Sequence, residues 1–232
     1  MIITLLNQKD KAWPYFLKFC RKSQPYKAFS CGSPSLRDKM IKNYFEDFRD
    51  TCDIYEVSNE NGVMIFLFLS EELHFYRIRF LFGLSDKFKT SELIKGFHAA
   101  MDSLGPKYFV SEVRRTKKLE SYKKWIDRHD NRCIILNNED QTMLWSSSKY
   151  MKGKMTVVGT NSATEKLLGK EAEYSSVLEI DKSLNVSTLT IGGEKYLFDA
   201  KKVSFFEKSA LIEGFVSNDI NLVGKLTLEF KP

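Results

Sequence analysis

The feature that most constrains this chain is a change in its hydrophobic pattern near residue 150. Before that point, segments whose apolar residues recur at helical spacing alternate with strand-like runs. After it, the chain contains short β-type runs separated by turn residues, with one short helical turn expected at residues 163–168. The pattern therefore predicts an α+β domain followed by a small all-β domain.

The composition changes at the same place. All three Trp, all four Cys and all three His precede it. Residues 1–150 contain 25 Lys and Arg against 19 Asp and Glu, whereas residues 151–232 contain 11 of each kind. A polar stretch at residues 146–150 suits a linker. These observations predict two domains, residues 1–148 and residues 149–232.

The first domain has the expected element order β, α, α, β, β, β, α, β, α, β, β. Its four helices each show one apolar face. They are expected over residues 11–21, from Ser33 or Ser35 to residue 50, from Thr90 or Ser91 to residue 104, and over residues 116–128. Asp10 is the expected N-cap of the first helix, and Asn61-Gly62 signals a hairpin turn. The strand at residues 63–69 is apolar throughout, which predicts burial on both faces. A helix that joins two strands in the middle of this order predicts one parallel pair in an otherwise antiparallel sheet.

The second domain is expected to contain strands only, apart from the short helical turn. Its β-type runs are residues 154–158, 175–180, 187–191, 195–199, 203–206, 210–216 and 222–230. Gly192-Gly193 between two of them signals a hairpin. Short strands at this spacing predict a small sandwich or barrel.

The element order over residues 1–146 resembles that of the GNAT superfamily of N-acetyltransferases. One local segment adds to this resemblance, because Tyr122, followed by Lys123-Lys124, matches a family tyrosine on the helix after the fifth strand. The Gly-Phe that follows in the family is replaced here by Ile126 and Asp127. The resemblance implies a GNAT-like mixed sheet flanked by helices, acetyl-CoA as cofactor, and Tyr122 as the acid that protonates the departing CoA thiolate.

The cofactor loop is where this chain departs from the family. GNAT proteins bind the pyrophosphate of acetyl-CoA on backbone amides at a helix N-terminus, and glycines permit the close approach. Here Phe88 and Thr90 replace both glycines, so that β-carbons obstruct the approach. The groups left to hold an anion are Lys87, which stands for the family arginine, Lys89, Thr90 and Ser91. This departure favours no cofactor, with acetyl-CoA as the alternative.

No motif sets a catalytic base or a metal site apart. The residues near strand ends, where a GNAT base could lie, are Glu71, Glu72, His74 and Glu112. Each is interpreted as a solvated or structural residue. The four cysteines have wide, irregular spacings without a Cys-x-x-Cys pair, which predicts free thiols and no zinc site.

A basic run at residues 114–128 carries interspersed acidic residues. Such a run can pair with phosphates of nucleic acid. The i,i+4 spacing of Glu120 and Lys124 favours a solvated helix face instead. No stretch is long and apolar enough to cross a bilayer, and the N-terminus lacks the features of a signal peptide. We therefore expect protein partners, no membrane, and a cytoplasmic or virion location.

Two functional hypotheses follow. Residues 108–115 and 122–125 resemble GNAT-like proteins encoded in bacteriophage virion gene clusters, in which the fold can serve assembly or attachment. Together with the β domain, this resemblance favours a non-catalytic structural or interaction protein in an oligomer or larger assembly, such as a phage virion. The alternative is an acetyl-CoA-dependent N-acetyltransferase with an atypical pyrophosphate loop.

Overall fold

The computed structural model divides the chain into two compact units, Met1–Gly105 (unit 1) and Pro106–Pro232 (unit 2). The residues that the structure describes are 1–22, 33–84, 86–105, 108–112, 133–135, 142–146, 155–181, 184–218 and 222–230. The boundary expected between residues 148 and 149 lies outside them and stays a prediction. The mixed α+β content that the sequence predicts is confirmed.

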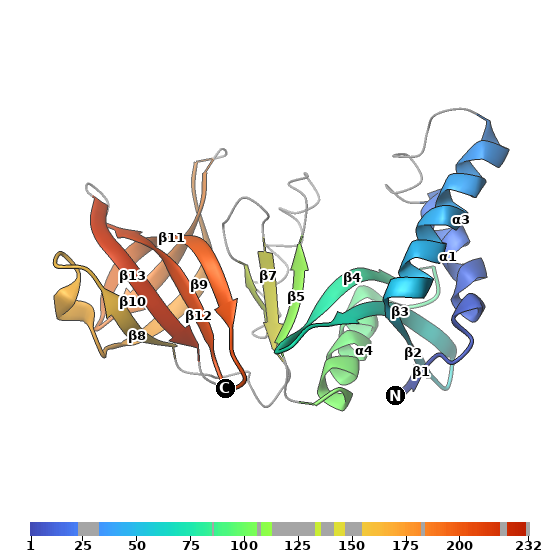
Figure 1. The fold of residues 1–232 in the computed structure, drawn as a ribbon, viewed down its shortest axis with the longest axis horizontal. Coiled ribbons are helices and arrows are strands. Elements are labelled where there is room, and N and C mark those ends of the chain that lie inside the picture. Colours follow the sequence, from blue (N-terminus) through green and yellow to red (C-terminus); the bar gives the residue numbers. More distant parts are fainter. Residues whose placement is uncertain are drawn as a thin grey trace. The chain divides into compact units, whose positions relative to one another are not determined.

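Unit 1 combines antiparallel strands with helices on both of their faces. Neighbouring strands follow the order β1-β2-β3-β4, and each adjacent pair is antiparallel. The strands are β1 (Ile2–Leu5), β2 (Asp53–Asn59), β3 (Gly62–Glu71) and β4 (Phe75–Gly83). The helices are η1 (Lys9–Ala12), α1 (Trp13–Lys22), α3 (Pro34–Thr51) and α4 (Thr90–Ser103). Figure 1 shows α1 and α3 on one side of the strands and α4 on the other.

Local sequence explains most of these boundaries. The Ser33 hydroxyl accepts a hydrogen bond from the Leu36 amide at 3.4 Å and caps α3, whose first residue is Pro34. Gly62 has φ 111° at the predicted hairpin turn, a conformation that other residues rarely adopt. The prediction that Asp10 caps α1 is wrong, because Asp10 lies inside the 3-10 turn η1 that precedes this helix.

A phenylalanine cluster holds α1 and α3 against the strands. The Phe16 ring of α1 lies 5.2 Å from that of Phe45 in α3 and 5.9 Å from that of Phe68 in β3, measured between centroids. The rings of Phe80 and Phe82 in β4 lie 5.1 Å and 6.0 Å from it. One buried side chain of α1 thus contacts three other elements, and such ring pairs contribute beyond the area that they bury.

Strand β3 is buried on both faces, as its unbroken apolarity predicts. All six residues from 64 to 69 are buried. On the face of α4, a Cβ added at Gly96 would lie 3.1 Å from the Ile65 side chain, so α4 approaches the strand closely. The core of unit 1 therefore has two layers with β3 between them.

Unit 2 begins with three short antiparallel strands. They are β5 (Tyr108–Glu112), β6 (Cys133–Ile135) and β7 (Thr142–Ser146), with β7 paired to both of the others. The expected parallel pair would join β4 to β5, which belong to different units, and it stays a prediction. The helix expected at residues 116–128 lies outside the described residues.

The rest of unit 2 is a closed six-stranded barrel. Its strands are β8 (Met155–Thr160), β9 (Glu171–Asp181), β10 (Leu184–Ile191), β11 (Glu194–Phe205), β12 (Ala210–Ser217) and β13 (Leu222–Phe230). Each strand pairs antiparallel with its neighbours in sequence, and β13 returns to pair with β8. Of the two predicted all-β architectures, the structure has the barrel.

The barrel merges two expected strands and confirms the expected helical turn. Residues 195–199 and 203–205 of the two expected strands belong to one strand, β11, with a register shift between Ala200 and Lys202, and the expected last residue, Phe206, lies just beyond it. A bulge of this kind interrupts the alternation from which strands are predicted. The short helix η3 (Glu165–Leu167) falls within the turn expected at residues 163–168.

Three contacts fix the interior of unit 2. A Cβ added at Gly214 would lie 2.4 Å from the Asp199 carbonyl oxygen and 2.7 Å from the Phe198 ring, so the ring occupies the place of a side chain there. The buried Thr164 hydroxyl donates to the Lys225 carbonyl at 2.7 Å and thus ties η3 to β13. The buried Tyr108 hydroxyl of β5 donates to the Phe230 carbonyl of β13 at 3.1 Å.

Candidate functional site

The loop between β4 and α4 is the predicted cofactor loop, and its apolar residues anchor it to the core. The Leu84 carbonyl accepts hydrogen bonds from the amides of Lys87 and Phe88, at 2.9 Å and 3.2 Å. Leu84 and Phe88 are both buried, with 7% of Phe88 exposed. Phe88 therefore contributes a core side chain at the position where the family resemblance places a glycine for close phosphate approach.

The N-terminus of α4 is capped by its own acidic residue. The Lys89 amide donates to the Glu92 carboxylate at 2.8 Å. Lys89 is the N-cap and Glu92 the third helical residue, which is the spacing at which a carboxylate reaches back to the first free amide. A negative charge in the first turn also interacts favourably with the helix dipole. An anionic ligand at this helix end would therefore have to compete with Glu92.

The same loop is also fixed by ion pairs with α1. The Asp86 carboxylate lies 2.9 Å from the Lys18 ammonium and 3.6 Å from the Lys22 ammonium. The hydrogen bond from Lys18 lowers the pKa of Asp86 below its usual value. The loop is thus anchored on its apolar side by the core and on its polar side by α1.

The four predicted anion-binding residues all lie on the surface around this helix end. They are Lys87, Lys89, Thr90 and Ser91, and all are exposed. Within residues 86–105, none of the described contacts joins any two of their side chains. These four residues are neighbours in the sequence, but their described side chains do not point to a common place where an anion could bind.

The predicted catalytic residues do not meet at a described site. Tyr122 lies outside the described residues. Glu72 is at the turn between β3 and β4, where its carboxylate lies 3.6 Å from the Arg77 guanidinium and its amide donates to the Phe75 carbonyl. The neighbouring Leu73 is 87% exposed, so this turn is a surface feature.

The remaining base candidates lie at the ends of strands. Glu71 is exposed at the end of β3, and His74 is half-buried just before β4. Of Glu112 the structure describes the backbone only, paired with Thr142 of β7.

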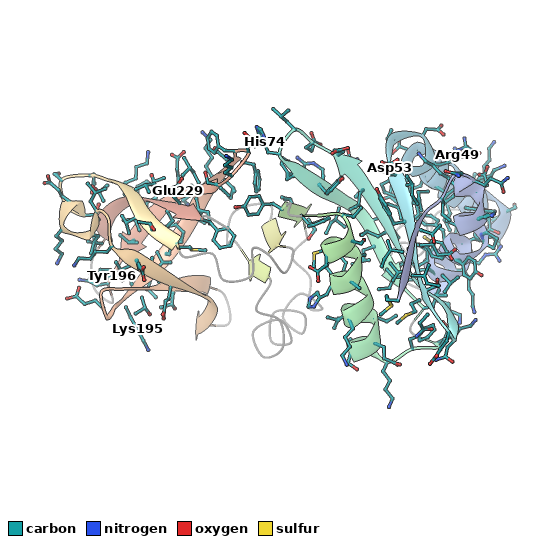
Figure 2. The ribbon with its side chains drawn as sticks, turned by 90° about the horizontal axis from the view of Figure 1, so that it is seen from below. Arg49, Asp53, His74, Lys195, Tyr196 and Glu229 are labelled. Carbon is teal, nitrogen blue, oxygen red and sulfur yellow. The ribbon has the colours of Figure 1, made fainter. Side chains whose placement is uncertain are left out.

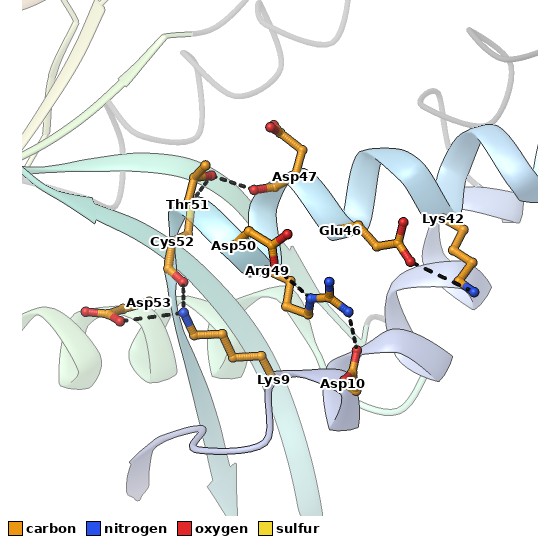
Figure 3. A network of polar contacts seen from close by, with 10 residues as sticks. All are labelled: Lys9, Asp10, Lys42, Glu46, Asp47, Arg49, Asp50, Thr51, Cys52 and Asp53. Carbon is orange, nitrogen blue, oxygen red and sulfur yellow. Dashed lines mark hydrogen bonds and ion pairs between the residues drawn. The ribbon is translucent and has the colours of Figure 1, made fainter.

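A second polar site, which the sequence analysis did not identify, lies between η1 and the end of α3. It is a pocket of about 530 Å³. Its lining residues are Asn7, Gln8, Lys9, Asp10, Lys11, Arg49 and Asp50. Figure 3 shows the polar contacts around it.

The charges of this pocket are largely paired with one another. The Arg49 guanidinium donates to the Asp50 carboxylate at 2.8 Å and to the Asp10 carboxylate at 3.4 Å (Figure 3). The hydrogen bond to Asp50 is the main cause that raises the pKa of Arg49, and the same bond lowers the pKa of Asp50. The Lys9 ammonium donates to the Cys52 carbonyl at 2.6 Å and lies 4.0 Å from the Asp53 carboxylate.

This arrangement braces η1 against the end of α3. A cation at a helix C-terminus satisfies an otherwise free carbonyl and interacts favourably with the dipole, which is the role of Lys9 at Cys52. The sequence carries no local signal for the network, since Asp10 and Arg49 are 39 residues apart. Figure 2 shows that Arg49 and Asp53 belong to the surface of unit 1.

Two of the cysteines are free and buried, as the sequence predicts. They are Cys20 and Cys52. Burial raises the pKa of Cys20 to about 12 and also raises that of Cys52, which disfavours the reactive thiolate. Within the described part of the chain, no group of three or more His, Cys, Asp or Glu residues is arranged to hold a metal ion.

Comparisons with known proteins identify no similar protein. No protein-family model, no curated protein and no solved structure matches this chain. No helix in the described ranges has the length and apolarity needed to cross a membrane.

Proposed function

We propose that this chain is a non-catalytic interaction protein that contributes to a larger assembly. The observation that carries the proposal is the state of the α4 N-terminus, where the Lys89 amide is bonded to the Glu92 carboxylate and Phe88 is buried beside it. In the resembling enzymes, this helix end is where acetyl-CoA binds.

Two physical effects oppose cofactor binding there. A pyrophosphate carries negative charge, and the Glu92 carboxylate already occupies the positive end of the helix dipole. The Cβ atoms of Phe88 and Thr90 also keep the backbone farther from a phosphate than glycine would. Moving Phe88 aside would expose an aromatic side chain that is now packed in the core.

The barrel of unit 2 supports an interaction function. Closure of the sheet leaves no free strand edge in the barrel, so it offers other proteins a rigid side-chain surface. The assembly that we propose is a bacteriophage virion, and the support for this choice is the sequence resemblance of residues 108–115 and 122–125.

Titration calorimetry of the full chain with acetyl-CoA tests the proposal. We expect no binding heat at ligand concentrations up to the millimolar range, because the helix end is capped from within. The variant Glu92→Gln keeps a hydrogen-bond acceptor but removes the charge. Comparing it with the natural chain therefore isolates the effect of the Glu92 charge on acetyl-CoA binding.

One result would overturn the proposal in favour of the N-acetyltransferase. This result is micromolar acetyl-CoA binding by the natural chain that is lost when Lys87 and Lys89 are both replaced by Ala. An assay for acetyl transfer to amines, with Tyr122→Phe as the second variant, would then test for catalysis.

A further inference from the structure

Strand β1 has one edge paired with β2 and one outer edge. The Leu6 amide donates to the Ile54 carbonyl at 2.9 Å, and Leu5 lies opposite Tyr55 in the same register. Backbone groups of successive residues in an antiparallel strand point alternately toward the partner and away from it. The amides and carbonyls of Ile3 and Leu5 therefore point to the outer edge. Among the described residues, no strand pairs with this edge, since β1 ends the strand order.

This edge lacks the features that usually prevent strand pairing. Charged side chains, prolines and bulges commonly protect the edges of sheets. Residues 1–5 contain no charged side chain and no proline, and the pairing of β1 with β2 shows no register shift. Large apolar side chains are also exposed along it, with Ile2 63% and Leu5 46% exposed. An uncharged, apolar edge of this kind is suited to accept another strand.

We infer that β1 pairs antiparallel with β1 of a second copy of this chain, across a two-fold axis at Thr4. The inference deepens the proposed interaction function by naming one partner, and it rests on that proposal. A two-fold axis is the commonest symmetry of protein dimers, and it requires a surface that is complementary to itself. An uncharged strand meets this requirement because it brings no like charges together.

The orientation of the backbone limits the register. Residues that point to the outer edge must face residues of the second copy that also point outward. The register centred on Thr4 satisfies this condition, because it places Ile3 opposite Leu5 of the second copy and Leu5 opposite its Ile3. Both outward amides and both outward carbonyls of each strand are then hydrogen-bonded.

The side chains fit the same register. Ile3 and Leu5 lie opposite Val57 and Tyr55 of β2, and Val57 lies beneath Gly96 of α4. In the paired state, the half-exposed Leu5 would be covered by Ile3 of the second copy on that face. On the other face Thr4 would lie opposite its own copy, and Thr–Thr pairs are favourable across antiparallel strands.

A proline substitution can test the outer edge of β1 without disturbing the edge that pairs with β2. Ile3→Pro removes an amide that points outward, so the ladder between β1 and β2 keeps its hydrogen bonds. Ile3→Ala is the matched control, because it also shortens the side chain but retains the amide. Light scattering on a sizing column at tens to hundreds of micromolar should give dimer mass for the natural chain and for Ile3→Ala, and monomer mass for Ile3→Pro.

A charge exchange at the axis tests the register itself. Thr4→Lys and Thr4→Glu each place like charges opposite one another, so both variants should be monomers. An equal mixture of the two should recover dimer mass, because opposite charges then meet. Circular dichroism of each variant checks that unit 1 remains folded.

Specific results would overturn the inference. A natural chain that is monomeric throughout the concentration range would do so, and so would a dimer that persists in both Ile3→Pro and Thr4→Lys, whose interface must lie elsewhere. These outcomes are distinct from failure of the proposed function. A monomer that does not bind acetyl-CoA removes only the dimer, whereas a dimer that binds acetyl-CoA removes only the non-catalytic proposal.

Discussion

The barrel of unit 2 and the strands of unit 1 differ in how their sheet edges are completed. The barrel of unit 2 closes on itself, with β13 returning to β8, so every strand is paired on both sides. Unit 1 leaves the outer edge of β1 without a described partner and obtains its stability from helices packed on both faces. Each barrel strand thus has two neighbours, whereas the strands of unit 1 are covered by helices and end at an edge to which another strand could be added.

The largest expected effect comes from the packing on which unit 1 depends. Phe68→Ala removes a fully buried ring that contacts Phe16, Phe45 and Phe48, and should destabilise unit 1 by about 4 kcal/mol. Hydrogen exchange followed by mass spectrometry should show lost protection in β3 and β4, with the barrel strands unchanged. Equal loss of protection in both units would contradict the division.

The corresponding test in the barrel is Gly214→Ala. Its methyl group would meet the Asp199 carbonyl and the Phe198 ring, so we expect a loss of about 3 kcal/mol confined to unit 2. Gly193→Ala is the control, because it lies in open space with φ 86° and should cost only about 1 kcal/mol. Urea unfolding of both variants checks the difference, and equal costs would show that the barrel wall can move aside.

Alkaline pH should weaken unit 1 through Cys20. Burial raises the pKa of this thiol in the folded state to about 12, above its value in the unfolded chain. The contribution of the protonated thiol to stability is therefore complete below the unfolded pKa and is lost as the pH rises toward 12. The loss of stability reaches about 1 kcal/mol by pH 10. Urea unfolding at pH 8 and pH 10 should show this loss, and Cys20→Ala should reduce it.

The smallest expected effect has the opposite sign. The Thr188 hydroxyl in β10 is buried and has no hydrogen-bond partner among the side chains and backbone groups that the structure describes. Thr188→Val replaces the hydroxyl by a methyl group of similar size and should stabilise the barrel by about 1 kcal/mol or less. Thermal unfolding compared with Thr188→Ser, which keeps the hydroxyl but removes the methyl group, provides the check. A lower melting temperature for Thr188→Val would mean that a water molecule satisfies the hydroxyl.

Local sequence patterns predicted the individual helices and strands better than they predicted the closure of the barrel. The apolar run of β3 and the turn at Gly62 are visible in the sequence because both depend on neighbouring residues. Closure of the barrel by β8 and β13 depends on pairs such as Met155 and Phe230. These residues are far apart in the sequence, so no local hydrophobic pattern predicts that they pair. The joining of β11 across a bulge escaped prediction for a related reason, since one extra residue shifts the alternation.

The candidate site shows the same limit. The family resemblance predicts a glycine at the position of Phe88, but the burial of Phe88 depends on the packing of the whole loop and has no local signal. The cap by Glu92 had a local signal, because it lies three residues after Lys89. The network of Arg49 with Asp10 had none, since its members come from distant segments.

The hydroxyl contact of Tyr108 with Phe230 has a consequence for the order in which the chain can fold. These residues are separated by 122 positions, so β5 leaves the ribosome long before its partner strand exists. Unit 1 is complete in sequence at Gly105 and can fold during synthesis, whereas unit 2 must wait for nearly its last residue. Throughout that interval, the barrel strands already synthesised remain unpaired, although unit 1, which precedes them in the sequence, can already be folded.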